Sequence, residues 1–143
     1  MNNVPVNILL VEDNSDHAQL VMRNLKNINI PNIVHHLDDG EVAMNYLQEI
    51  SNGGKKPHMI LLDLRLPKID GIEILKFIKS SANLKDIPVV ILTTSEAERD
   101  IVEVYGYNAN SYLVKPVDFA KFSELMETLG SYWMCWNKNP ISN

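Results

Sequence analysis

A set of acidic, hydroxyl and amino side chains directly follows the short apolar runs of this sequence. The set comprises Glu12, Asp13, Asp63, Thr93, Ser95 and Lys115. Three carboxylates in one hollow would repel each other, and a hard divalent cation with oxygen ligands, such as Mg²⁺, relieves that repulsion best. A carboxylate beside such an ion can act as a nucleophile and form an aspartyl phosphate. A lysine ammonium can then pair with the phosphoryl oxygens.

The apolar runs have the length of β-strands. They span residues 8–11, 33–34, 59–62 and 89–92, with a weaker run at 112–114. Their nearly continuous apolar character is typical of parallel strands that are covered on both faces. Segments with helical spacing lie between them, although the segment at 98–105 is weak and the last, at 122–133, is strong. This alternation predicts an α/β fold in which five helices doubly wind a five-stranded parallel sheet.

The predicted fold explains why these side chains matter together. In doubly wound sheets, ligands bind beyond the carboxyl ends of the strands, so side chains that follow different strands converge on one rim. Taken alone, Glu12 and Asp13 are equally typical of residues that cap the first helix, where negative charge is favourable. The convergence of all the strand ends favours the chemical interpretation.

The composition indicates one compact domain. The 143 residues are 45% apolar, and 13 Lys and Arg against 18 Asp and Glu give a net charge of −5. This charge argues against non-specific binding to nucleic acid or anionic lipid. No apolar stretch is long enough to span a membrane and the N-terminus lacks a signal peptide, so we expect a cytoplasmic protein. We expect a single domain over 1–143, with a short apolar extension at about 130–143.

Four segments of the sequence resemble those of a known family. The segments ILLVEDN, MILLDLRLPKIDG, PVVILTTSE and SYLVKP are similar to those of a response-regulator receiver domain, the CheY-like phosphoacceptor of two-component signalling. The resemblance extends from about residue 6 to residue 129. It implies a flavodoxin-like fold with strand order 2-1-3-4-5. It also implies a single-domain response regulator that accepts a phosphoryl group from a sensor histidine kinase and has no enzymatic activity beyond self-phosphotransfer and autodephosphorylation.

The resemblance assigns roles to the acidic residues. Asp63 would be the phosphoacceptor. Asp13, Asp63 and the backbone carbonyl of Arg65 would bind Mg²⁺, with Glu12 acting partly through a metal-bound water. Gly71 lies where the family turns into its third helix.

The resemblance also implies a switch. Thr93 would hydrogen-bond the phosphoryl group and Lys115 would pair with it. Tyr112, the aromatic residue that changes rotamer in this family, would turn into the space that Thr93 vacates. Arg65 and Ser95 flank the expected acyl phosphate, and we expect them to influence its lifetime.

The C-terminal segment predicts a contact surface. Because the sequence ends soon after the fifth expected helix, we expect the output to be a contact that the receiver itself makes. The run 132–136 is strongly apolar and carries Trp133 and Trp136. We expect a homodimer through the face formed by the fourth helix, the fifth strand and the fifth helix, with these tryptophans as anchors. The alternative is a tail that folds over its own domain. The sequence is also similar to stand-alone regulators paired with cyanobacterial phytochrome kinases, which implies a phytochrome as the sensor kinase.

Three other classes of function are alternatives for this sequence. A phosphohydrolase of the haloacid dehalogenase type needs a second Asp two residues after the nucleophile, where this chain has Arg65. A flavodoxin-like cofactor binder is disfavoured because Glu12 and Asp13 would repel a phosphate. A receiver that no longer accepts phosphate and acts as a scaffold stays open as an alternative. A histidine metal site is disfavoured, because His35 and His36 are neighbours on an expected strand and point to opposite faces.

Overall fold

Strands and helices alternate from residue 6 to residue 93, and one more described strand follows. This computed structural model describes residues 5–27, 31–93, 106, 111–114, 120 and 124. The elements in chain order are β1 (Val6–Val11), α1 (Ser15–Lys26), β2 (Asn32–Leu37), α2 (Gly40–Ser51), β3 (Met59–Asp63), α3 (Gly71–Ser80), β4 (Val89–Thr93) and β5 (Ser111–Val114).

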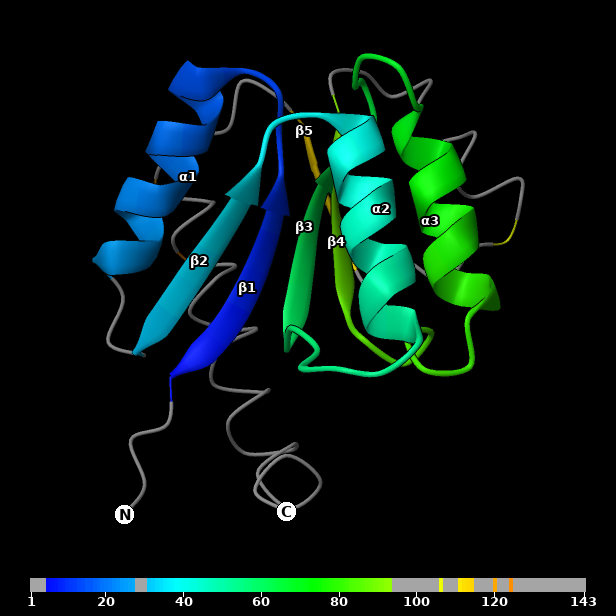
Figure 1. The fold of residues 1–143 in the computed structure, drawn as a ribbon. Coiled ribbons are helices and arrows are strands. Elements are labelled where there is room, and N and C mark those ends of the chain that lie inside the picture. The colour runs from blue at the N-terminus through cyan, green and yellow to red at the C-terminus, as the bar shows by residue number, and fades with distance from the viewer. Residues whose placement is uncertain are drawn as a thin grey trace.

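The five strands form one sheet in the order β2-β1-β3-β4-β5, and every neighbouring pair is parallel. Figure 1 shows α1 on one side of this sheet and α2 with α3 on the other. The predicted fold class and strand order are therefore confirmed. The predicted fourth and fifth helices lie outside the described residues, apart from single helical positions at Ala120 and Glu124.

The core consists of two apolar layers, one on each face of the sheet. Alternate residues of each strand point to opposite faces. Leu9 and Leu62 pack with the α2 and α3 side chains, whereas Leu10 and Leu61 pack with the α1 side chains. All five residues of β3 are buried. This burial on both faces is the reason that the strand sequences read as continuous apolar runs.

Each of the three helices in the described ranges begins with a polar N-cap residue in the loop that follows a strand. The Asn14 side chain accepts a hydrogen bond from the His17 N–H at 3.0 Å. Asp39 caps α2, and Asp70 caps α3. These caps satisfy backbone donors that the helix itself leaves unpaired. Asn14, and not the preceding acidic pair, therefore caps α1, so the alternative interpretation of that pair as helix caps is wrong.

Two glycines hold the loop between β3 and α3 in close packing. A Cβ atom at Gly40 would collide with the carbonyl oxygen of Ile69, and one at Gly71 would collide with the carbonyl oxygen of Asp63. Lys68, in the same loop, has a positive φ of 71° and places its Nζ 3.0 Å from Asp39 Oδ2. The backbone that follows Asp63 is thus packed against the first turns of two helices.

None of the helices in the described ranges is both long and apolar enough to cross a membrane.

Candidate functional site

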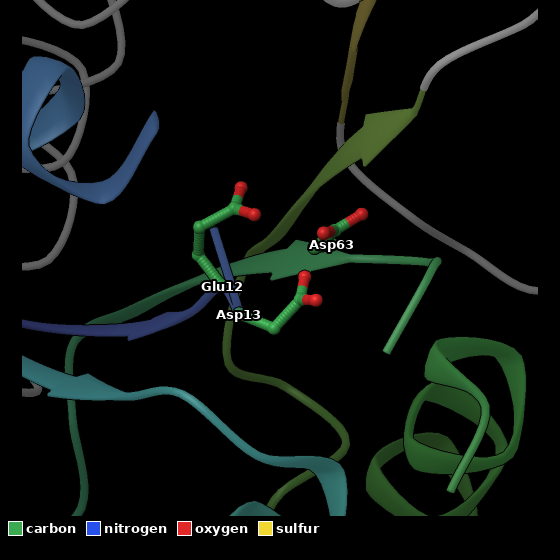
Figure 2. Close-up of side chains that lie close together, drawn as sticks. All are labelled: Glu12, Asp13 and Asp63. Carbon is green, nitrogen blue, oxygen red and sulfur yellow. The ribbon is translucent and has the colours of Figure 1, made fainter. Parts of the chain in front are cut away.

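Three carboxylates meet beyond the carboxyl ends of β1 and β3. One carboxylate oxygen from each of Glu12, Asp13 and Asp63 lies within 4.8 Å of the other two. Figure 2 shows the three side chains gathered around one space, with Asp63 reaching it from a different strand than the other two. The predicted convergence of these residues is confirmed.

The register of the sheet produces this meeting. β1 and β3 are parallel neighbours in which Val11 lies opposite Leu62. The next residue on each strand, Glu12 and Asp63, therefore reaches the same rim. Asp13 follows at the point where the chain leaves β1 for the α1 cap.

The three carboxylates differ in their access to water. Glu12 is 0% exposed and Asp63 is 1% exposed, whereas Asp13 is exposed. Buried carboxylates lose hydration and repel each other, so their charged forms need hydrogen bonds or a cation. Glu12 Oε2 accepts a hydrogen bond from the Asn14 N–H at 3.2 Å, and Asp63 Oδ1 accepts one from the Arg65 N–H at 3.0 Å. These neutral donors orient the carboxylates but do not cancel their charge.

The donor set fits a hard divalent cation. All three side chains offer carboxylate oxygens, and oxygen ligands are what Mg²⁺ prefers. The exposed carboxylate of Asp13 opens the cluster to solvent, which suits an ion that keeps several of its waters. This is the one group of potential metal ligands found within the described ranges, and it contains no histidine.

The remaining predicted site residues are placed only in part. Leu92 lies opposite Asp63, and Thr93 lies opposite Val114, so the backbones of β4 and β5 end at the same rim. The side chains of Thr93 and Tyr112 lie outside the described residues, as do Ser95 and Lys115 entirely. The Arg65 side chain is exposed. The roles assigned to these five residues stay predictions.

Two neighbours of the site were not singled out from the sequence. Asn14 supplies the N–H that Glu12 accepts, and the ring of His36 lies against the Glu12 backbone, with Nε2 2.8 Å from the carbonyl oxygen. Its neighbour His35 instead makes an edge-to-face contact with Tyr46 at 4.9 Å between ring centroids. The two adjacent histidines thus have separate partners, as their alternation along a strand predicts.

A comparison with known sequence families decides the class. The family described as Response regulator receiver domain matches residues 8–127. The chain belongs to this family. The match covers every strand of the sheet except the first two residues of β1, and it includes all three carboxylates of the site.

Receiver proteins of similar length share much of this sequence. The "Probable methanogenesis regulatory protein FilR2" of Methanothrix harundinacea is 45% identical over 137 residues, which is 95% of this chain and 88% of that protein. The "Response regulator Rcp1" of Synechocystis sp. is 40% identical over 135 residues, which is 93% of this chain and 92% of that protein.

Solved structures of such regulators share the fold. The structure titled as the phosphorylated cyanobacterial phytochrome response regulator RcpA has a TM-score of 0.76 and 38% identity, covering 92% of this chain and 95% of that one. The Mn²⁺-bound form of Rcp1 has a TM-score of 0.75 and 42% identity, covering 90% and 94%. This receiver domain is therefore similar to response regulators associated with phytochromes, as predicted.

Proposed function

We propose that this receiver domain accepts a phosphoryl group on Asp63 from a sensor histidine kinase, in a reaction that depends on Mg²⁺, and signals through changed protein contacts. The observation that carries the proposal is the meeting of Glu12, Asp13 and Asp63 within 4.8 Å at the carboxyl rim. Two similar proteins support it, because solved structures exist of phosphorylated RcpA and of Mn²⁺-bound Rcp1.

The carboxylates and one backbone group would hold the ion. Asp13, Asp63 and the Arg65 carbonyl would bind it directly, and Glu12 would bind it through a water. When bound, Mg²⁺ offsets the charge of the carboxylates and of an incoming phosphoryl group, which would otherwise repel each other. The short loop between Asp63 and Gly71 supplies the backbone part of this site.

Asp63 would act as the nucleophile. A carboxylate oxygen of Asp63 attacks phosphorus while the bond between phosphorus and the kinase histidine nitrogen breaks, so one acyl phosphate forms and one imidazole is released. The Arg65 N–H, 3.0 Å from Asp63 Oδ1, fixes the plane of the attacking carboxylate. Lys115 would pair with the phosphoryl oxygens and Thr93 would hydrogen-bond them. Arg65 and Ser95, which flank the product, would set its lifetime.

Phosphorylation would change the surface of the protein at the edge of the sheet that β5 forms. Tyr112 lies opposite Ile91 in the β4–β5 pairing, two positions before the Thr93 pair. A phosphoryl group that draws Thr93 inward would let the Tyr112 ring turn and would change the face formed by the fourth helix, β5 and the fifth helix. We assign a homodimer contact to that face, with Trp133 and Trp136 as anchors.

The kinase is assigned by class. A sensor histidine kinase is the donor that the receiver family implies, and the similarity to RcpA and Rcp1 favours a phytochrome kinase among such sensors. The name of FilR2 refers to a different process, regulation of methanogenesis. A phosphotransfer assay against a phytochrome kinase and a second sensor kinase would discriminate between these assignments.

The test of the proposed function is incubation with Mg²⁺ and acetyl phosphate, followed by intact mass. We expect the mass of one phosphoryl group to be added to the wild type and to Asp86→Asn, a variant at an exposed position just before β4, but not to Asp63→Asn. No gain in the wild type would contradict the proposal and favour the scaffold alternative. Continuous release of phosphate from many organophosphates would favour the hydrolase.

A further inference from the structure

The imidazole of His36 contacts the backbone at the acidic cluster. Its Nε2 atom lies 2.8 Å from the carbonyl oxygen of Glu12. A carbonyl oxygen can only accept a hydrogen bond, so Nε2 must carry the hydrogen and donate it. His36 is half-buried near the carboxyl end of β2, one of the two edge strands of the sheet.

This hydrogen bond lies where β1 leaves the sheet. The last paired residues of the two strands are Val11 and Leu37. The Glu12 N–H still donates to the Leu37 carbonyl at 3.1 Å. The Glu12 carbonyl receives a hydrogen bond from the His36 ring. The His36 side chain thus holds the peptide group between Glu12 and Asp13, just beyond the last paired residue of β1.

The peptide group that His36 contacts links Glu12, whose carboxylate is buried, to Asp13, whose carboxylate is exposed. A peptide unit is planar, so the direction of the Glu12 carbonyl fixes the positions of the Asp13 nitrogen and Cα, from which the Asp13 side chain extends. Glu12 is held further by the bond from the Asn14 N–H to Oε2. Asp13 is exposed and has no comparable burial to orient it.

We propose that His36 is a positioning residue for the cation site: its Nε2–H holds the peptide between Glu12 and Asp13 so that the Asp13 carboxylate faces Asp63. This inference rests on the proposed function, because it concerns the same cation. It assigns to β2, which contributes no carboxylate, a part in binding the ion.

The adjacent histidine provides the control. His35 is exposed and its ring contacts Tyr46 of α2, not the acidic cluster. The same substitution at position 35 therefore removes a strand histidine without touching the Glu12 carbonyl.

The experiment compares His36→Met with His36→Gln, two side chains of similar length and volume. Glutamine can donate a hydrogen bond to the Glu12 carbonyl and methionine cannot. Dissociation constants for Mn²⁺ are measured from the free-ion signal in electron paramagnetic resonance, and those for Mg²⁺ by competition. Urea unfolding in EDTA verifies that each variant is folded.

We expect His36→Met to weaken binding of both ions about three- to tenfold, the effect of losing one hydrogen bond. His36→Gln should stay within about twofold of the wild type, as should His35→Met. The rate of phosphorylation by acetyl phosphate at subsaturating Mg²⁺ should fall in His36→Met, because the weaker site holds less of the ion.

Several results would overturn the inference. They are unchanged ion affinity in His36→Met, a loss in His36→Gln equal to that in His36→Met, or an equal loss in His35→Met. If the wild type binds Mn²⁺ but is not phosphorylated, the proposed function fails while the inference is still decided by these affinities. If the wild type binds neither ion, both fail.

Discussion

Substituting Asp13 by Asn should stabilise the protein when divalent ions are absent. The three carboxylates lie within 4.8 Å of one another, and two unit charges at that distance repel by about 3.5 kcal/mol at an effective dielectric constant of 20. Asp13 is exposed, so water screens much of its repulsion with Glu12 and Asp63. We therefore expect Asp13→Asn to raise the free energy of unfolding in EDTA by about 1–2 kcal/mol.

The order of stability should reverse when Mg²⁺ is added. An ion that binds only the folded state stabilises it by about 2.7 kcal/mol at a hundredfold excess over its dissociation constant. Asp13→Asn removes one charged ligand and should lose most of this stabilisation. The residue thus lowers the stability of the ion-free protein in exchange for ion binding, as functional residues often do.

The assay is urea unfolding of both proteins in EDTA and in excess Mg²⁺. Glu49→Gln serves as the matched control, because it also removes one negative charge. Glu49 lies near the C-terminal end of α2, and the opposite end of that helix is the one at the carboxyl rim. We expect equal m values throughout, since the same surface is exposed on unfolding. An Asp13→Asn protein that is less stable than the wild type in EDTA would show that Asp13 does not destabilise the ion-free site. One that gains as much from Mg²⁺ as the wild type would show that Asp13 is not a ligand of the ion.

Three further predictions concern residues around the site and in the scaffold. Gly71→Ala should lower the free energy of unfolding by at least about 2 kcal/mol, because its Cβ would collide with the Asp63 carbonyl oxygen, and it should also slow phosphorylation at saturating Mg²⁺. Asn14→Ala should cost about 1 kcal/mol through loss of the α1 cap, and Asn14→Asp should restore most of it, both measured by urea unfolding. Burial, and then the nearby charge of Lys55, lower the pKa of His58 below its ordinary 6.5. Between that lowered pKa and 6.5, the unfolded chain binds more protons than the folded protein does. The midpoint of urea unfolding should therefore fall as the pH drops through 6.5 toward the pKa of His58 in the folded protein. His58→Gln should flatten this pH dependence.

Each of these predictions has a contrary outcome. A Gly71→Ala protein as stable and as reactive as the wild type would show that the loop after Asp63 can shift at little cost. Equal stability of Asn14→Ala and Asn14→Asp would show that the cap contributes nothing. A stability profile that is flat across pH 6.5 in the wild type, or unchanged in His58→Gln, would show that the half-buried His58 ring does not cause the loss of stability at low pH.

The sequence predicts the central strand β3 better than the edge strand β2. β3 is buried on both faces and its apolar run coincides with the observed strand, except that Asp63 extends it by one residue. β2 pairs on one side only and carries exposed residues, so its apolar signal at 33–34 covers only part of Asn32–Leu37. A half-exposed edge strand tolerates polar residues such as His35 and His36, and these hide it from a search for apolar runs.

The sequence likewise predicts some features of the candidate site and not others. Glu12, Asp13 and Asp63 can be predicted to meet, because parallel strands end at a common rim whatever the details of packing. The hydrogen bond from His36 to Glu12 cannot, because it depends on the register of β1 with β2 and on the path of the chain beyond Val11. The roles expected of Thr93 and Lys115 stay predictions, and family resemblance supports them more than spacing does, since spacing alone does not distinguish these residues from others at the rim.

Chemical trapping of the modified residue is the most direct test of whether Asp63 accepts the phosphoryl group in a reaction that depends on Mg²⁺. Borohydride reduces an acyl phosphate of aspartate to homoserine, which peptide mass spectrometry then locates in the chain. After treatment with Mg²⁺ and acetyl phosphate, we expect homoserine at position 63, and no conversion when EDTA is present. Homoserine at another aspartate, or conversion at position 63 that does not depend on Mg²⁺, would contradict this expectation.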